Sequence, residues 1–315
     1  MEQQKIGQPP VLFLDDFYQV NIVAFVDGSV ELFGIIGNPV RHSLSPVMQN
    51  AAFASLGMNR IYVPMSVADP AQAVPGLRAL GFQGVSVTVP HKEAVIPFLD
   101  AVDPVAAQIG AVNTLLLRQD SAGKVRIQGY NTDWLGANAA LTAAKVNLQG
   151  SRVLVAGAGG AAKAVAFGLK QAGANVLITN RSAVPGQTLA AWLNCEFVPL
   201  QEADRQTGDI FINTTSVGME PDLNGCVIPP AMLPNFSAVM DIVYAPLETR
   251  LLREAKAAGC TTIDGLAMLL HQGAEQFRIW TGQPAPEAVM RAALEEELRR
   301  RNERVRHKQT EKLKK

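Results

Sequence analysis

The chain has 315 residues, 48% of them hydrophobic and 18% charged, and its 28 basic and 28 acidic residues leave no formal net charge. This composition is typical of a globular protein, and the length suggests two domains. A balanced charge gives no bulk attraction for nucleic acid or a membrane surface. We therefore expect neither as a partner, and no segment approaches the roughly 18 uninterrupted apolar residues that a membrane helix needs.

The three cysteines, Cys195, Cys226 and Cys260, are scattered and show no CxxC or CxH spacing. This pattern argues against a disulfide framework and against a zinc site. The histidines also lack metal-ligand spacing, so we expect no metal. The N-terminus lacks the basic-then-apolar order of a signal peptide, and these features together predict a cytoplasmic protein.

The first 20 residues are mixed in character, include Pro9-Pro10, and are expected to form a loosely ordered extension. Two apolar runs, 21–26 and 30–37, then flank Asp27-Gly28-Ser29. Asp-Gly between apolar runs indicates a β-hairpin. The second run could instead pair inside a parallel sheet, and the sequence leaves both possibilities open.

From residue 31 the chain alternates strand-like and helix-like patterns. Strands are predicted at 30–37, 61–67, 84–90, 111–118 and 124–131, and helices from Pro46, near 70–80 and near 92–100. This alternation predicts an α/β fold with a mostly parallel, doubly wound sheet.

A second α/β unit begins near Asp133. Helices are predicted over 134–146, 161–172, 186–194 and 248–258, interleaved with six strand-like runs. The last helical stretch, 266–300, has no strand partner, so the simplest topology packs it back on the first domain. The expected domains are 1–132 plus 266–315, a discontinuous α/β domain, and 133–265, a Rossmann-type doubly wound parallel sheet.

The strongest single motif is VLVAGAGGAAKAV, residues 153–165, in which Gly157, Gly159 and Ala162 fit G-x-G-x-x-A. A strand precedes this loop, a helix follows it, and a second strand completes one βαβ unit. Gly157 allows the tight turn, Gly159 lets the backbone approach a pyrophosphate, and Ala162 allows close helix–strand packing. The helix N-terminus then offers free N–H groups to phosphate.

The end of the next strand carries Asn180-Arg181-Ser182. An NAD site would place a carboxylate there for the ribose 2′-hydroxyl, whereas a guanidinium suits a 2′-phosphate. NADP is therefore favoured over NAD.

Several residues of the first domain permit both a structural and a functional interpretation. Ser45 stands before Pro46 and is interpreted as a helix N-cap, although Ser43 and Ser45 together could also bind a substrate carboxylate. Asp133 precedes an apolar helix and is interpreted as a cap. Lys92, taken alone at the end of a strand stopped by Pro90, is interpreted as a solvated lysine.

Nine segments taken together change that interpretation. They are GNPVRHSLSP (37–46), SVTVPHKEAV (86–95), IGAVNTL (109–115), GYNTDWLG (129–136), GAGGAAKAV (157–165), TNRS (179–182), INTTSVGM (212–219), MDIVYAPLETRLL (240–252) and DGLAMLLHQGAEQF (264–277). In this order and spacing they closely resemble the shikimate dehydrogenase family, from about residue 30 to about residue 290. The resemblance does not include the first 20–30 residues or the basic tail 299–315.

The resemblance implies reversible NADPH-dependent reduction of 3-dehydroshikimate to shikimate, in aromatic amino-acid biosynthesis, by a substrate-binding domain and a cofactor domain. It implies that Lys92 is catalytic and paired with Asp133. The implied substrate contacts are Ser43 and Ser45 to the carboxylate, Thr88, Asn113, Asp133 and Gln272 to the hydroxyls, and Tyr244 at the same site. The implied cofactor contacts are Gly157, Ala158, Gly159, Gly160, Ala161, Asn180, Arg181, Ser182, Thr214, Ile242 and Gly265.

The chemistry agrees with this resemblance, because hydride delivery to a ketone leaves negative charge on oxygen, which a protonated lysine can neutralise. Ser182 and Pro185 depart from the family's NADP-preferring pattern, which has Thr and a second basic residue there. Use of NAD therefore stays open, as does quinate as a slow substrate. The alternatives are an NAD-dependent quinate/shikimate dehydrogenase and a non-catalytic nucleotide-binding paralogue. We expect a monomer or homodimer with a small-molecule substrate.

Overall fold

A computed structural model describes residues 26–313, with side-chain surroundings for 26–304. The extension expected over residues 1–20 and the first run of the expected hairpin lie outside the described residues. The chain divides into two compact units, 1–30 and 31–315. In the described part of the first unit, the Asp27 carboxylate accepts hydrogen bonds from the Ser29 amide and hydroxyl at 2.8 and 2.7 Å, which forms a turn.

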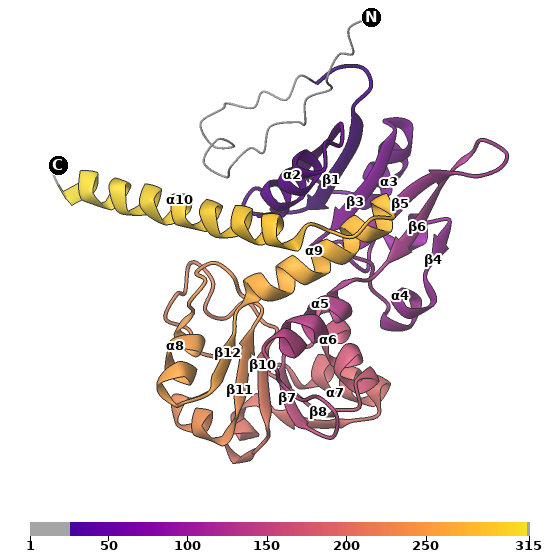
Figure 1. The fold of residues 1–315 in the computed structure, drawn as a ribbon. Coiled ribbons are helices and arrows are strands. Elements are labelled where there is room, and N and C mark those ends of the chain that lie inside the picture. The colour runs from indigo at the N-terminus through magenta and orange to yellow at the C-terminus, as the bar shows by residue number, and fades with distance from the viewer. Residues whose placement is uncertain (1–25, 314–315) are drawn as a thin grey trace, which may run out of the picture. The chain divides into compact units, whose positions relative to one another are not determined.

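The second unit contains two six-stranded sheets (Figure 1). The first has the order β2-β1-β3-β5-β6-β4. Its strands are β1 (Glu31–Gly37), β2 (Arg60–Ser66), β3 (Phe82–Val87), β4 (Ala101–Val102), β5 (Thr114–Gln119) and β6 (Val125–Tyr130). β5 is antiparallel to both of its neighbours, β3 and β6. Its pairing with β6 is antiparallel because the tight turn over 120–124 joins the two strands directly. β1 pairs in parallel with β2 and β3, so the run 30–37 is a sheet strand.

Three α-helices accompany this sheet: α2 (Ser45–Ser55), α3 (Pro70–Ala79) and α4 (Pro104–Ile109). The prediction of a helix near 92–100 is wrong, because only a single 3₁₀ turn, Ile96–Phe98, forms there. Pro97 has no amide hydrogen and would interrupt a helix that began near residue 92.

The second sheet is entirely parallel and has the order β12-β11-β10-β7-β8-β9. Its strands are β7 (Arg152–Ala156), β8 (Asn175–Asn180), β9 (Glu196–Pro199), β10 (Ile210–Asn213), β11 (Ala238–Asp241) and β12 (Thr261–Ile263). Numbered within the sheet, this is the 3-2-1-4-5-6 order of the dinucleotide-binding fold. The predicted fold class, a discontinuous α/β domain with a Rossmann-type domain, is confirmed.

Helices cover both faces of the second sheet, because alternate side chains of each strand point to opposite sides. Val153 and Val155 of β7 lie in one apolar cluster with α5 (Asp133–Ala143), α6 (Gly160–Gln171) and α7 (Ala183–Leu193). Leu154 of the same strand lies in a second cluster, with α8 (Arg250–Ala257).

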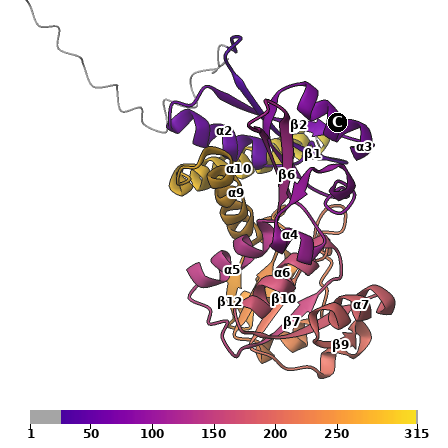
Figure 2. The ribbon, with the colours of Figure 1, turned by 90° about the vertical axis from the view of Figure 1, so that its right-hand side faces the viewer.

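The expected helix over 266–300 is two helices, α9 (Gly265–Thr281) and α10 (Glu287–Leu313). Gly282, with φ of 72°, ends α9, and Pro284 and Pro286 separate it from α10. Both helices contribute to the apolar cluster of the first sheet, and Figure 2 shows them beside α2. The Trp280 indole N–H also donates to the Leu115 carbonyl at 3.0 Å. The C-terminal helices therefore complete the core that residues 31–130 begin.

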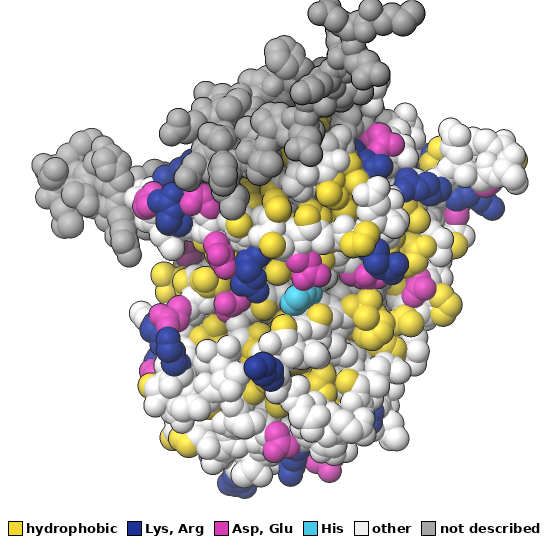
Figure 3. Space-filling model, in the orientation of Figure 1, with side chains coloured by type: hydrophobic (Ala, Val, Ile, Leu, Met, Phe, Trp, Pro, Cys, Tyr) yellow, Lys and Arg dark blue, Asp and Glu magenta, His cyan; other side chains and the backbone are white. Residues whose placement is uncertain are grey.

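Basic and acidic side chains are interspersed on the face drawn in Figure 3. On α10, Arg299, Arg300 and Arg301 each form an ion pair with a glutamate three or four residues away.

Among the described helices, none combines the length and apolar character needed to cross a membrane.

Gly84 of β3 offers a test of this packing. A Cβ at Gly84 would lie 2.5 Å from Cδ1 of the buried Trp280 indole, which cannot move aside. We expect Gly84→Ala to lower the free energy of unfolding by roughly 1–3 kcal/mol in urea titrations. The control is Gly76→Ala in α3, where the added Cβ meets nothing within 4 Å. Because alanine favours helix, that variant should gain up to about 1 kcal/mol, and equal behaviour of the two variants would contradict the prediction.

Candidate active site

A cavity of about 460 Å³ lies where the carboxyl ends of β1 and β3 face those of β10 and β11. Ligands in parallel α/β folds bind at this end of the strands. The cavity brings together most of the predicted site. Its lining includes Ser43, Ser45, Thr88, Lys92, Asn113, Asp133, Tyr244 and Gln272, and, from the predicted cofactor set, Ala161, Thr214, Ile242 and Gly265.

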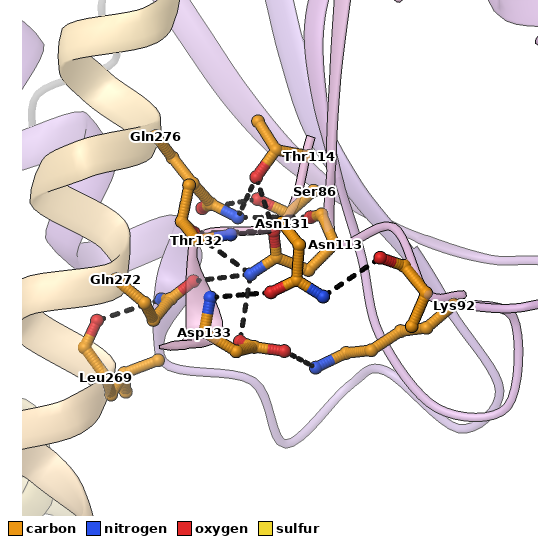
Figure 4. Close-up of polar contacts among 11 residues, drawn as sticks. Ser86, Lys92, Asn113, Thr114, Asn131, Thr132, Asp133, Leu269, Gln272 and Gln276 are labelled. Atoms are coloured by element: carbon orange, nitrogen blue, oxygen red, sulfur yellow. Dashed lines mark hydrogen bonds and ion pairs between the residues drawn. The ribbon is translucent and has the colours of Figure 1, made fainter. Parts of the chain in front are cut away.

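An ion pair between Lys92 and Asp133 occupies one wall of the cavity (Figure 4). Lys92 Nζ lies 2.5 Å from Asp133 Oδ2, and the two side chains are 17% and 6% exposed. The interpretation of Asp133 as a helix cap is wrong, because Thr132 occupies the cap position of α5. The Asp133 carboxylate instead accepts from Lys92 and, at 2.8 Å, from Asn113 Nδ2.

Asn113 lies immediately before β5 and is buried among polar side chains of three elements. Its Oδ1 accepts from the Thr132 amide at 2.8 Å, and its Nδ2 lies 3.4 Å from Gln272 Oε1. Gln272 Nε2 donates to the carbonyl of Leu269 on its own helix at 2.8 Å. Asn113, Asp133 and Gln272 therefore form one connected group beside Lys92.

Ser43 and Ser45 line the same cavity from the start of α2. The interpretation of Ser45 as the N-cap is wrong, because the helix begins at Ser45 itself and Leu44 holds the cap position. The Ser43 hydroxyl accepts from the Ser45 amide at 3.2 Å. Arg301 of α10 donates to the carbonyl of His42 at 2.7 Å, so the C-terminal helix holds the residue before Ser43.

Thr88 reaches the cavity because Gly37 has no side chain, since a Cβ there would lie 2.4 Å from Thr88 Cγ2. Tyr244 is on the loop that follows β11. Burial raises the pKa of Tyr244, and the positive charge of Arg301 partly offsets that rise.

Asp241 anchors the start of the Tyr244 loop. Its carboxylate accepts from the Asn213 side-chain amide at 2.9 Å, the Thr249 hydroxyl at 2.7 Å and the Val243 backbone amide at 3.0 Å. Burial raises the pKa of Asp241 to about 6.

The glycine-rich loop has the geometry that a pyrophosphate requires. Gly157 has φ of 124°, and a Cβ there would lie 2.3 Å from Thr214 Oγ1. Space around Gly159 is open, and near Gly160 a Cβ would come within 4 Å only of the Lys92 side chain. α6 starts here with no side chain capping its free amides. A bare backbone cradle at a helix N-terminus fits a dinucleotide's phosphates.

Some predicted cofactor residues do not line the main cavity. Ala158 borders a second, shallower pocket between α4, α6 and α7. Asn180, Arg181 and Ser182 follow β8, where Asn180 Nδ2 donates to the Ser182 carbonyl at 2.8 Å and Arg181 is exposed. The lining of the main cavity also excludes Gly157, Gly159 and Gly160.

Two cavity residues, Ser86 and Gln276, were absent from the sequence-based set. Gln276 follows Gln272 by four residues and so lies on the same face of α9. Ser86 precedes Thr88 by two residues and so points to the same face of its strand. These spacings are the signals that could have identified them. Among residues 26–304, whose side-chain surroundings are described, no three His, Cys, Asp or Glu side chains converge to hold a metal ion.

Fold and cavity together define a two-domain protein of the dinucleotide-binding class. Three family models match the chain: the shikimate dehydrogenase substrate-binding domain over 35–115, shikimate/quinate 5-dehydrogenase over 139–220, and the shikimate 5′-dehydrogenase C-terminal domain over 265–295. A shikimate dehydrogenase (NADP⁺) from Moorella thermoacetica is 45% identical over 286 residues, 87% of this chain and 95% of that protein. The chain belongs to the shikimate dehydrogenase family.

Two solved structures of related dehydrogenases are similar to this chain over most of its length. Shikimate 5-dehydrogenase from Thermus thermophilus, in complex with NADP(H) and shikimate, matches with a TM-score of 0.78 at 40% identity, over 84% of this chain and 99% of that one. Quinate dehydrogenase from Corynebacterium glutamicum, in complex with NAD, matches with a TM-score of 0.77 at 30% identity, over 84% and 98%.

The raised pKa of Asp241 predicts a pH dependence of stability. The folded protein binds this proton more tightly than an unfolded chain, whose carboxyl titrates near 3.8. The unfolding free energy of the wild type, relative to Asp241→Asn, should therefore fall as pH rises from about 3 to about 7, by roughly 3 kcal/mol. Urea titrations of both proteins across this range measure the difference, and a rise with pH would contradict the assignment.

Proposed function

We propose that this protein is an NADP-dependent shikimate dehydrogenase, which reversibly reduces 3-dehydroshikimate to shikimate. The observation that carries the proposal is the Lys92–Asp133 pair, 2.5 Å apart in a cavity that Ala161, at the start of the helix after the glycine-rich loop, also lines. A proton donor beside a nucleotide cradle is the arrangement that carbonyl reduction needs.

When bound, NADPH supplies the hydride. Lys92 holds a proton at Nζ and neutralises the negative charge that develops on the substrate oxygen. Asp133 accepts a hydrogen bond from that ammonium and keeps it directed into the cavity. In the oxidative direction the same pair receives the proton from the hydroxyl. Lys92 and Asp133 are the proposed catalytic residues.

Substrate recognition is assigned to the remaining polar groups of the cavity. The hydroxyls of Ser43 and Ser45 are suited to a carboxylate near the positive end of α2. The ring hydroxyls of shikimate would meet the side-chain amides of Asn113 and Gln272, which donate and accept hydrogen bonds without carrying a charge. The full proposed substrate set is Ser43, Ser45, Thr88, Asn113, Asp133, Tyr244 and Gln272.

The proposed cofactor residues form two groups. Gly157 to Ala161 hold the pyrophosphate, with Thr214, Ile242 and Gly265 near the nicotinamide half. Asn180, Arg181 and Ser182 meet the adenosine end, where the exposed Arg181 guanidinium suits a 2′-phosphate. Pro185 offers no second positive charge there, so we propose NADP as the preferred cofactor with a weaker discrimination against NAD.

We further propose a substrate domain of residues 31–132 plus 266–315 and a cofactor domain of residues 133–265. The two sheets and the packing of α9 and α10 on the first support these boundaries. Residues 1–30, included with the substrate domain in the sequence-based division, group apart from the rest by contacts. The proposed compartment is the reducing cytoplasm, since all three cysteines are free thiols.

Lys92→Ala tests the catalytic assignment. Loss of the proton donor should lower kcat by roughly 10²–10⁴-fold with little change in KM for shikimate. Steady-state assays that follow NADPH absorbance measure both constants. The matched control is Lys124→Ala in the exposed β5–β6 turn, which should turn over normally. Near-normal kcat in Lys92→Ala would remove Lys92 from the mechanism.

Assays that cross shikimate and quinate with NADP and NAD test the specificity. The highest kcat/KM should belong to shikimate with NADP, whereas a preference for quinate with NAD would support a catabolic quinate enzyme instead.

Arg181→Ala should raise KM for NADP by roughly 10-fold or more, because it removes a charge-assisted contact. KM for NAD should stay unchanged in that variant, and exposed Arg205→Ala serves as the control.

A further inference from the structure

A chain of buried polar side chains runs along the cavity and ends at Asn113, and Figure 4 labels its members Ser86, Gln276, Thr114 and Asn113. The chain begins at Tyr62, whose hydroxyl is bonded to Ser86. Its members Tyr62, Ser86, Gln276 and Thr114 are 1%, 3%, 2% and 0% exposed. They come from β2, β3, α9 and β5, so the chain crosses from the sheet to the C-terminal helix and back.

Each hydrogen bond in this chain has a defined direction. The Tyr62 hydroxyl donates to Ser86 Oγ at 2.7 Å, and Ser86 donates its own hydrogen to Gln276 Oε1 at 2.8 Å. Gln276 Nε2 donates to Thr114 Oγ1 at 3.0 Å and to the Asn113 carbonyl at 3.1 Å. The Thr114 hydroxyl then donates to Asn113 Oδ1 at 2.7 Å.

The last step fixes the orientation of the Asn113 amide. Oδ1 accepts from the Thr114 hydroxyl and also from the Thr132 amide, so two donors face it. A reversed amide would place its NH₂ group against both donors, which would leave buried polar atoms unpaired. Asn113 must therefore direct Nδ2 toward Asp133 Oδ1, where the separation is 2.8 Å.

We propose that Gln276 is a positioning residue, which acts through Thr114 and Asn113 to hold Asp133 in its alignment with Lys92. The inference rests on the proposed dehydrogenase function. Both ends of the Gln276 amide are used inside this chain, so its contribution is to set the direction of the hydrogen bonds. The same chain ties the hydroxyl of Tyr62 to the Lys92–Asp133 pair.

Gln276→Leu removes the donor and the acceptor together. The Thr114 hydroxyl is then free to turn away, and Asn113 Oδ1 keeps the Thr132 amide as a donor but loses the second donor that helps to hold its NH₂ group against Asp133. We expect kcat/KM for shikimate to fall roughly 10- to 100-fold, through a higher KM and a lower kcat. KM for NADP should stay within about twofold, because the glycine-rich loop belongs to the other sheet.

Gln276→Glu keeps the shape and changes only the donor. The introduced carboxyl can donate to Thr114 only while it is protonated, and burial favours that protonated form. The kcat/KM of this variant, divided by that of the wild type, should therefore fall as pH rises. Tyr62 is the titratable member of the chain, and Lys92 and Asp133 lie beyond its end. His271 and Glu275, also on α9, are paired with Glu287 and Arg278.

Gln49→Met is the matched control. Gln49 is a fully buried glutamine of α2 that also reaches α9, and its side-chain amide donates to the Gly273 carbonyl at 2.9 Å and not to Tyr62, Ser86, Gln276 or Thr114. This variant should lose stability without a rise in KM for shikimate relative to KM for NADP.

The outcomes separate the two proposals. If the wild type oxidises shikimate and the Gln276 variants behave like Gln49→Met, Gln276 is only a core residue and the positioning role is wrong. A relative activity of Gln276→Glu that does not change with pH would equally contradict the positioning role. If the wild type does not oxidise shikimate with either cofactor, the proposed function itself fails. Shikimate binding by calorimetry in Gln276→Leu then still reports on the site, and unchanged affinity would overturn the positioning role independently.

Discussion

The ion pair between Lys92 and Asp133 is the interaction on which the arrangement of the site depends. Lys92 belongs to the turn that leaves β3, and Asp133 is the first residue of the helix that leads into the second sheet. Two charges that are largely removed from water are stable only when further hydrogen bonds satisfy their remaining atoms. Asn113 provides the second bond to the carboxylate, at 2.8 Å, so the pair requires the edge of β5 as well as the two segments that carry the charges.

This requirement explains the position of the C-terminal helices. Asn113 needs further partners, and α9 supplies two of them, one helical turn apart. Gln272 Oε1 lies 3.4 Å from the Nδ2 atom that also donates to Asp133, and Gln276 Nε2 donates to the Asn113 backbone carbonyl. α9 can lie there only because its apolar face completes the core of the first sheet, where Trp280 packs on Phe33 with ring centroids 5.6 Å apart. A chain that ended with the second sheet would lack both that core and those amides.

The sequence predicted most of the features that depend on local pattern. The G-x-G-x-x-A loop, the six strands of the second sheet and the return of the last helical stretch follow from periodicity and glycine spacing. The error over 92–100 is local, because Pro97 prevents that helix. Ser45 and Asp133 have the residue types and positions of caps, yet Leu44 and Thr132 occupy those positions. Asp133 instead pairs with Lys92, and Ser45 lines the cavity, which segments remote in sequence form together and a local pattern cannot contain.

Gln276 shows the same limit of local sequence patterns, because the sequence-based set of site residues did not include it. A glutamine on an amphipathic helix is ordinarily a surface residue, and within α9 only its four-residue spacing from Gln272 distinguishes it from Glu275 beside it. Its role becomes visible only when Ser86, Thr114 and Asn113, 190, 162 and 163 residues away, are brought to its two amide atoms. Buried amides of this kind are costly unless every atom is paired, and here each bond also dictates the direction of the next. Neutral groups that touch neither Lys92 nor Asp133 are thus connected to the Asp133 carboxylate through directed hydrogen bonds.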